Sequence, residues 1–199
     1  MKKSLSTLII LIVSIRLFAQ ISQFEFDNTY SKLIEDLTNE NWVMTDSLTT
    51  YLLNKINNLD SMTYEKKVLR YISIYSTAGL LNEKNITKEK ALIKVKKYEG
   101  LEMIMPAHPI KNNCYINCTY LASDRKNTLF SGVNNSQGTQ IFSFEYIKMK
   151  DPIDENSIKK IEGKFVSLKG KLKKVNLEGN MFPRFKMEFV NGEIEIMNE

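Results

Sequence analysis

Residues 182–197 read FPRFKMEFVNGEIEIM, and this pattern decides how the second half of the chain is interpreted. Apolar and polar residues alternate on both sides of Asn191-Gly192, as is typical of strands with one buried face. Both residues of an Asn-Gly pair accept positive φ, which a two-residue hairpin turn requires. The pattern therefore predicts two antiparallel strands, 182–190 and 193–197, joined by a turn at Asn191-Gly192.

A second alternating segment, 164–176, precedes this stretch. Its apolar residues share one face and its lysines the other, and a glycine-containing turn at 178–180 directs it toward 182–190. Further strands are predicted at 101–105, 114–122, 127–133 and 139–149. We therefore expect residues 101–199 to form a mainly antiparallel β barrel or sandwich, which is OB-like only at the level of this pattern and implies no activity.

Residues 21–100 carry the 3.6-residue periodicity of helices. Their apolar stripes predict four helices that begin near residues 28, 45, 63 and 87, and Gly100 is placed to end the last one. The apolar stripe of the third helix consists of Tyr64, Val68, Tyr71, Ile72 and Tyr75. The expected fold class is therefore α+β, with an N-terminal bundle of about four helices followed by the β-rich region. No long linker separates the two regions, so a one-domain and a two-domain arrangement both stay open.

Residues 1–20 have the three parts of a secretory signal peptide. Two lysines supply the positive start, residues 5–15 are almost wholly apolar, and Ala19 is a small residue near the expected cleavage site. A membrane anchor needs roughly 18 apolar residues, and Arg16 interrupts a shorter run, so retention as an anchor is the weaker alternative. We expect an exported protein, periplasmic or secreted, with no stable membrane insertion after cleavage.

The charge of the chain argues against nucleic acid as a partner. Its 28 basic and 23 acidic residues give a net charge of +5, but three of the basic residues lie in the predicted signal peptide, so the remainder is nearly neutral. The clearest basic feature is a set that we call the lysine stripe, formed by Lys169, Lys171, Lys173 and Lys174. It suits an unknown acidic protein or an anionic glycan. The alternative is a solvated strand face whose lysines prevent aggregation.

Cys114 and Cys118 are the only cysteines. In a straight strand, residues four apart lie roughly 13 Å from each other, beyond the span of a disulfide, whereas a turn brings them within reach. The asparagines around them favour a turn, and export would place them where disulfides form. The sequence leaves the bonded and the free state open.

The one histidine, His108, lies between Pro106 and Pro109 in a stiff, extended segment. As a general base it could activate Cys114 or a serine, with Asp124 orienting the imidazole, which would make the protein a small hydrolase. A single histidine excludes multi-histidine metal sites, and we expect neither a metal nor a cofactor.

We therefore predict an exported, non-catalytic binding protein whose ligand or partner the sequence does not identify. Two alternatives stay open. One is the small hydrolase that uses His108. The other is a structural component of an envelope assembly, which would expose a large apolar patch.

Overall fold

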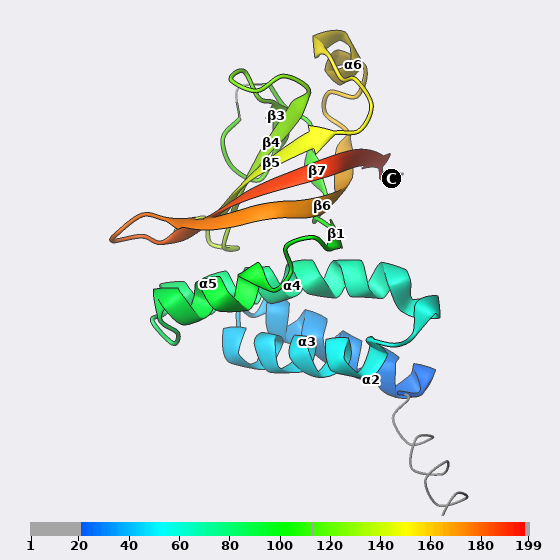
Figure 1. The fold of residues 1–199 in the computed structure, drawn as a ribbon, viewed down its shortest axis with the longest axis vertical. Coiled ribbons are helices and arrows are strands. Elements are labelled where there is room, and N and C mark those ends of the chain that lie inside the picture. The colour runs from blue at the N-terminus through cyan, green and yellow to red at the C-terminus, as the bar shows by residue number, and fades with distance from the viewer. Residues whose placement is uncertain (1–20, 113, 198–199) are drawn as a thin grey trace, which may run out of the picture.

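Residues 21–112 and 114–197 are described by the computed structural model (Figure 1). Within them the chain forms five α-helices and one seven-stranded, mostly antiparallel sheet, so the predicted α+β class is confirmed. The predicted signal peptide, residues 1–20, lies outside the described residues.

Four helices occupy the segment that the sequence predicts to be helical. They are α2 (Gln23–Thr38), α3 (Trp42–Ile56), α4 (Thr63–Asn82) and α5 (Lys88–Lys96), with a 3₁₀ turn, η2 (Asp60–Met62), before α4. Helix α2 begins before the expected cap at Asn28, because the Ser22 side chain accepts a hydrogen bond from the Glu25 backbone N–H at 3.1 Å. Thr87 caps α5 in the same way.

Helix α4 lies between two apolar clusters. On one side, Leu69 packs in a cluster with Leu33 of α2 and Leu52 of α3. On the other, Ile74 and Leu81 belong to a cluster that also contains most of the buried residues of the sheet. In Figure 1, α4 and α5 accordingly lie next to the sheet, and α2 and α3 lie beyond them. One continuous core therefore joins the helices to the sheet.

The sheet is built around two long strands. The strands are β1 (Glu102–Ile104), β2 (His108–Pro109), β3 (Thr119–Leu121), β4 (Thr128–Asn134), β5 (Ile141–Met149), β6 (Phe165–Glu178) and β7 (Arg184–Ile196). Their order is β1-β6-β7-β5-β4-β3, and β2 also pairs with β6. All pairs are antiparallel except β5 with β7. The short helix α6 (Glu155–Lys160) connects β5 to β6.

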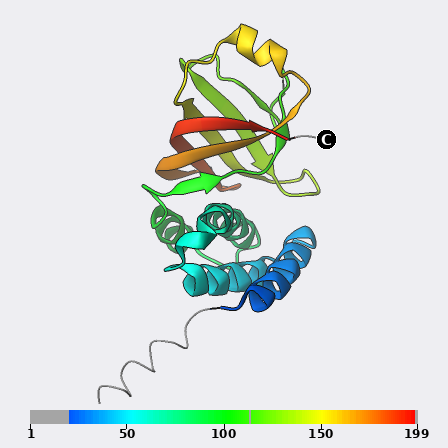
Figure 2. The same cartoon turned by 90° about the vertical axis from the view of Figure 1, so that its right-hand side faces the viewer.

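The strand order is open, so the structure does not show the predicted closed barrel or sandwich, and the OB-like comparison stays a prediction. Figure 2 shows the strands curving over the helices, but only an isolated bridge, from Ile110 to Thr119, links the segments beside β2 and β3. Strand β2 is two residues long, and one of them, Pro109, has no backbone N–H with which to extend a ladder.

Asn191-Gly192 is a β-bulge and not the predicted hairpin turn. Strand β7 runs through this pair without reversing and stays paired with β6 along its length. Lys169 pairs with Glu193 and Lys171 with Val190, so both residues of Asn191-Gly192 lie opposite a single residue of β6. The positive φ that the turn prediction required is present at Asn191, at 56°, but it bends the strand instead of ending it.

The chain reverses instead at residues 179–183, beginning within the other turn that the sequence predicts. Strand β6 has 14 residues and β7 has 13, so one long hairpin pairs them along their whole length. A turn at Asn191-Gly192 would leave residues 165–170 of β6 without β7 as a partner. Gly192 also packs closely on β5, since a Cβ there would lie 2.6 Å from Ile147 Cγ2. The bulge therefore allows β7 to pack closely against both β6 and β5.

We expect Asn191→Val to lower the free energy of unfolding by about 1–3 kcal/mol, because a β-branched residue is strained at positive φ. Asn191→Gly, which accepts this conformation, should leave stability nearly unchanged. Urea unfolding followed by circular dichroism measures both variants. Equal stability of the two would contradict the bulge geometry.

The helices meet the sheet through a cluster of aromatic rings. Trp42 of α3, Tyr75 of α4 and Phe142 of β5 contact one another edge to face, with ring centroids 5.0–5.4 Å apart. The indole of Trp42 lies on the backbone of α4 at Gly79, where a Cβ would come within 2.2 Å of Trp42 Cδ2. Glycine is therefore required in the last turn of this helix by the close approach of the indole.

Gly79→Ala is expected to lower the free energy of unfolding by about 2 kcal/mol through overpacking, although alanine favours a helix over glycine by about 1 kcal/mol. In a Trp42→Leu background the same change should cost much less or become neutral. A double-mutant cycle measured by chemical denaturation checks this. An equal loss in both backgrounds would mean that Trp42 is not the cause.

Candidate functional site

A concave site lies between the helices and the sheet, and we call it the interlayer cleft. Its volume is about 720 Å³. The helical wall is formed by Tyr64, Val68, Tyr71 and Tyr75, which follow one face of α4, together with residues of α2. The opposite wall comes from residues 104–109, 133–136 and the start of β6. The sequence predicted the α4 stripe as core, but part of it lines this cleft.

The lining of the interlayer cleft is apolar and uncharged. Among the lining residues that the structure describes, none is Asp, Glu, Lys or Arg. The polar groups are tyrosine hydroxyls, asparagine amides, serine hydroxyls and His108. Several of them already have partners, since the Tyr75 hydroxyl donates to the Asn134 carbonyl at 2.9 Å and the Ser167 hydroxyl to the Met105 carbonyl at 2.9 Å.

A buried carboxyl group lies next to the cleft wall. Glu145 of β5 is 1% exposed and accepts hydrogen bonds from the hydroxyls of Tyr71, at 2.5 Å, and Ser143, at 2.9 Å. Burial raises the pKa of Glu145 to about 7, although both hydrogen bonds act in the opposite direction. Burial also raises the pKa of Tyr71 well above its ordinary value. Below neutral pH this contact between α4 and the sheet is therefore uncharged.

The sequence pattern alone marks neither Glu145 nor Tyr71 as a functional residue. Tyr71 was placed in the apolar stripe of the third helix. Glu145, Ile147 and Met149 alternate along the strand and so share one face, and Ile147 and Met149 are buried in the core. The alternation therefore predicts that the Glu145 carboxyl group faces inward. A charged residue on the apolar face of a strand was the signal that could have identified it.

His108 lines the interlayer cleft from β2, where it pairs with Val166. Burial lowers the pKa of His108 to about 4, so the imidazole is neutral at physiological pH. Its Nε2 atom is buried without a hydrogen-bond partner among the described residues. A base of such low pKa is poorly matched to proton transfer near pH 7.

The structure does not bring His108, Cys114 and Asp124 together. His108 lines the interlayer cleft, Cys114 lines a cavity beside α6, and Asp124 lines a shallow pocket of about 190 Å³ on the outer face of the sheet. Asp124 lies 3.7 Å from the Arg125 guanidinium and not beside the imidazole. The constellation that the hydrolase alternative requires is therefore not assembled.

Cys114 and Cys118 are joined by a disulfide, which resolves the alternative that the sequence left open. Their Cα atoms lie 6.2 Å apart, because the segment between them turns and Asn117 adopts a positive φ of 53°. In this state Cys114 has no thiolate with which to act as a nucleophile.

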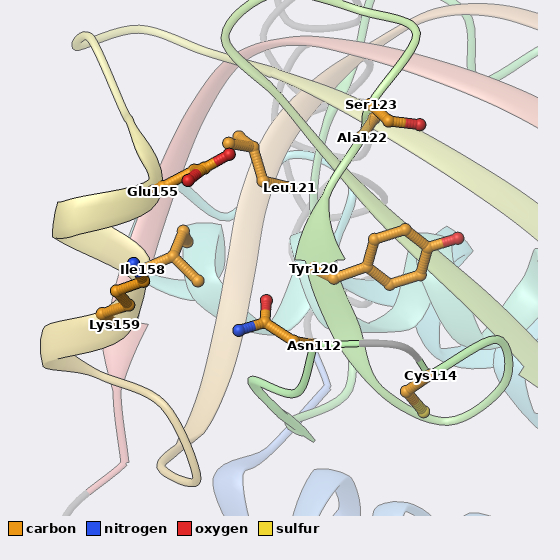
Figure 3. Close-up of a pocket in the computed structure, with 9 residues that line it drawn as sticks. All are labelled: Asn112, Cys114, Tyr120, Leu121, Ala122, Ser123, Glu155, Ile158 and Lys159. Carbon is orange, nitrogen blue, oxygen red and sulfur yellow. The ribbon is translucent and has the colours of Figure 1, made fainter.

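The cavity beside α6 has a volume of about 570 Å³ (Figure 3). Figure 3 shows Glu155, Ile158 and Lys159 on α6 facing Leu121 of β3, with Tyr120 directed away from the helix. Glu155 and Lys159, its described charged lining residues, are both exposed. The charged groups of this cavity are thus in contact with solvent, and its lining is less apolar than that of the interlayer cleft. The interlayer cleft is therefore the stronger candidate site.

One lysine of the lysine stripe forms an ion pair, and two others lie opposite carboxylates that bind a different cation, Glu102 to Lys67 and Glu188 to Arg125. Three of its four lysines lie beside an acidic residue on a neighbouring strand. These are Lys169 with Glu195, an ion pair at 2.7 Å, Lys171 opposite Glu102, and Lys174 opposite Glu188. Such pairing reduces the net charge that this face presents to an anionic partner.

No family model, curated protein or solved structure matches this chain. Within residues 21–112 and 114–197, no group of three or more His, Cys, Asp and Glu side chains is placed to hold a metal ion. No helix in the described part of the chain has the length and apolar character of a membrane span.

The buried carboxyl group predicts a pH-dependent stability. The pKa of Glu145 is raised in the folded protein from 4.5 to about 7, so the stability that it contributes is complete below pH 4.5 and is lost as pH rises through 7. We expect the wild-type protein to lose about 3 kcal/mol more than Glu145→Gln between pH 4.5 and pH 8. Chemical denaturation across this range measures the difference.

Glu155→Gln is the matched control, because Glu155 is an exposed residue of α6. It should keep the pH profile of the wild type. If Glu145→Gln also kept that profile, Glu145 would not be the group that titrates.

Proposed function

We propose that this chain is an exported, non-catalytic binding protein that holds a neutral, mainly apolar small molecule in the interlayer cleft. The observation that carries the proposal is the cleft itself, a concave space of about 720 Å³ with an uncharged lining rich in tyrosine. Ligand pockets in proteins have volumes of roughly 300–1,000 Å³ and are lined mainly by apolar and aromatic side chains with a few polar groups.

The uncharged lining supports a neutral ligand. A charged ligand that entered this cleft would lose water without finding an opposite charge among the described lining residues, which is unfavourable. The tyrosine hydroxyls and asparagine amides supply hydrogen-bonding groups that orient a hydroxyl or carbonyl of a ligand. Large apolar side chains also remain exposed at the cleft, since Tyr64 is 58% and Phe165 54% exposed. A bound apolar ligand would cover them.

The Cys114–Cys118 disulfide supports the exported part of the proposal. Disulfides persist in the periplasm and outside the cell and are rare in the reducing cytoplasm. A disulfide is compatible with the secretory signal that residues 1–20 predict. We therefore propose that the ligand is met after export.

Binding of the neutral fluorophore N-phenyl-1-naphthylamine tests the cleft. We expect saturable fluorescence enhancement with the wild-type protein. Ala107 lines the cleft and is exposed, so Ala107→Trp should fill the space without disturbing the core and weaken binding by about tenfold or more. An anionic naphthalene sulfonate should bind more weakly than the neutral fluorophore.

Ile93→Trp is the matched control, because Ile93 is 71% exposed on α5 and lines none of the described cavities. It should bind the fluorophore as the wild type does. Equal affinities of Ala107→Trp and Ile93→Trp would place fluorophore binding elsewhere and contradict the proposal.

A further inference from the structure

The turn between β6 and β7 exposes two large apolar side chains in succession. We call residues 179–183 the tip. Met181 is 84% exposed, more than any other large apolar residue that the structure describes, and Phe182 is 70% exposed. Figure 1 shows the tip at the far end of the long hairpin, above one end of α5. Most of the surface of both adjacent side chains is therefore in contact with solvent.

The tip is held in place by the helices. The Lys88 ammonium group, at the start of α5, donates hydrogen bonds to the carbonyls of Gly179, at 3.2 Å, and Asn180, at 2.9 Å. The two apolar side chains are therefore presented on a turn that is anchored to the rest of the fold. A fixed presentation lowers the entropy lost when a surface is contacted.

A basic groove of about 780 Å³ lies between the tip and the α4–α5 connection. Three lysines line it, Lys84, Lys88 and Lys90, and no Asp or Glu is found among its described lining residues. The acidic residues that are nearest along the chain, Glu83 and Glu89, do not belong to this lining. This end of the molecule thus combines an apolar projection with positive charge.

We propose that the tip docks the protein onto an anionic lipid surface, with Met181 and Phe182 in the headgroup region and Lys84 and Lys90 on lipid phosphates. Apolar side chains that enter the interface and lysines that meet anionic headgroups are the two contributions that hold peripheral proteins on membranes. A convex projection suits a lipid surface, which deforms around it. A protein partner would need a complementary hollow. The proposal does not depend on what the interlayer cleft binds.

Sedimentation with vesicles tests the proposal. The full protein should bind vesicles of equimolar phosphatidylglycerol and phosphatidylcholine, and bind pure phosphatidylcholine vesicles much more weakly. The double variant Met181→Ser, Phe182→Ser should lose binding to both. The double variant Lys84→Gln, Lys90→Gln should lose roughly tenfold in affinity for the anionic vesicles alone.

Matched controls come from other faces of the molecule. Phe24→Ser removes a comparably exposed apolar side chain of α2, and Lys159→Gln with Lys160→Gln removes two exposed lysines of α6; Figure 1 shows both helices away from the tip. Both should bind anionic vesicles as the wild type does. If the control variants lost as much affinity for anionic vesicles as the tip variants, binding would reflect nonspecific electrostatic attraction to the vesicles, and the proposal would be overturned.

Fluorescence reports insertion directly. The emission of Phe182→Trp should shift to shorter wavelength when anionic vesicles are added, whereas that of Phe24→Trp on α2 should not shift. Circular dichroism verifies that each variant is folded. Absence of the shift together with unchanged sedimentation would overturn the proposal. The proposal would also be overturned if the wild-type protein bound no vesicles and the tip variants instead lost binding to an acidic protein.

Discussion

The contact of Trp42 with Gly79, Tyr75 and Phe142 joins the helical part of this protein to its sheet. Three aromatic rings from α3, α4 and β5 meet edge to face, and the indole fits only because α4 carries no side chain at Gly79. Aromatic contacts of this kind combine a large buried area with a preferred orientation. They determine where α4 lies on the sheet, and the position of α4 in turn determines the shape of the space beside it.

The interlayer cleft follows from that position. From Tyr71 onward α4 is buried except for Tyr75 and Asn82, which are in part exposed, whereas Tyr64 at its start is 58% exposed. The C-terminal part of the helix therefore packs closely on the core, and the cleft lies beside its N-terminal part. Glu145 lies next to this cleft, and burial raises its pKa to about 7, so this carboxyl group is mainly neutral at acidic pH. The lysines lie on the outer surfaces.

The candidate site could be anticipated only in part. Helical periodicity placed Tyr64, Val68, Tyr71 and Tyr75 on one face of one helix, and the structure keeps them there. Whether such a face is filled by neighbouring side chains or left open depends on which strands oppose it, and periodicity carries no information about that. His108 was expected on an extended segment and does line the cleft. Its supposed partners line other cavities, because closeness in sequence does not place side chains together in a fold.

By itself, the sequence determined the α+β class, the helices of residues 21–100 and the reversal after β6, because these depend on local periodicity, capping side chains and turn residues. Tertiary structure alone decided whether Asn191-Gly192 ends a strand or bends it. An Asn-Gly pair accepts positive φ in both cases, and the full pairing of β7 with β6 selected the bulge. It also decided that the α4 stripe faces a cleft, because the opposing wall comes from residues far away in the chain.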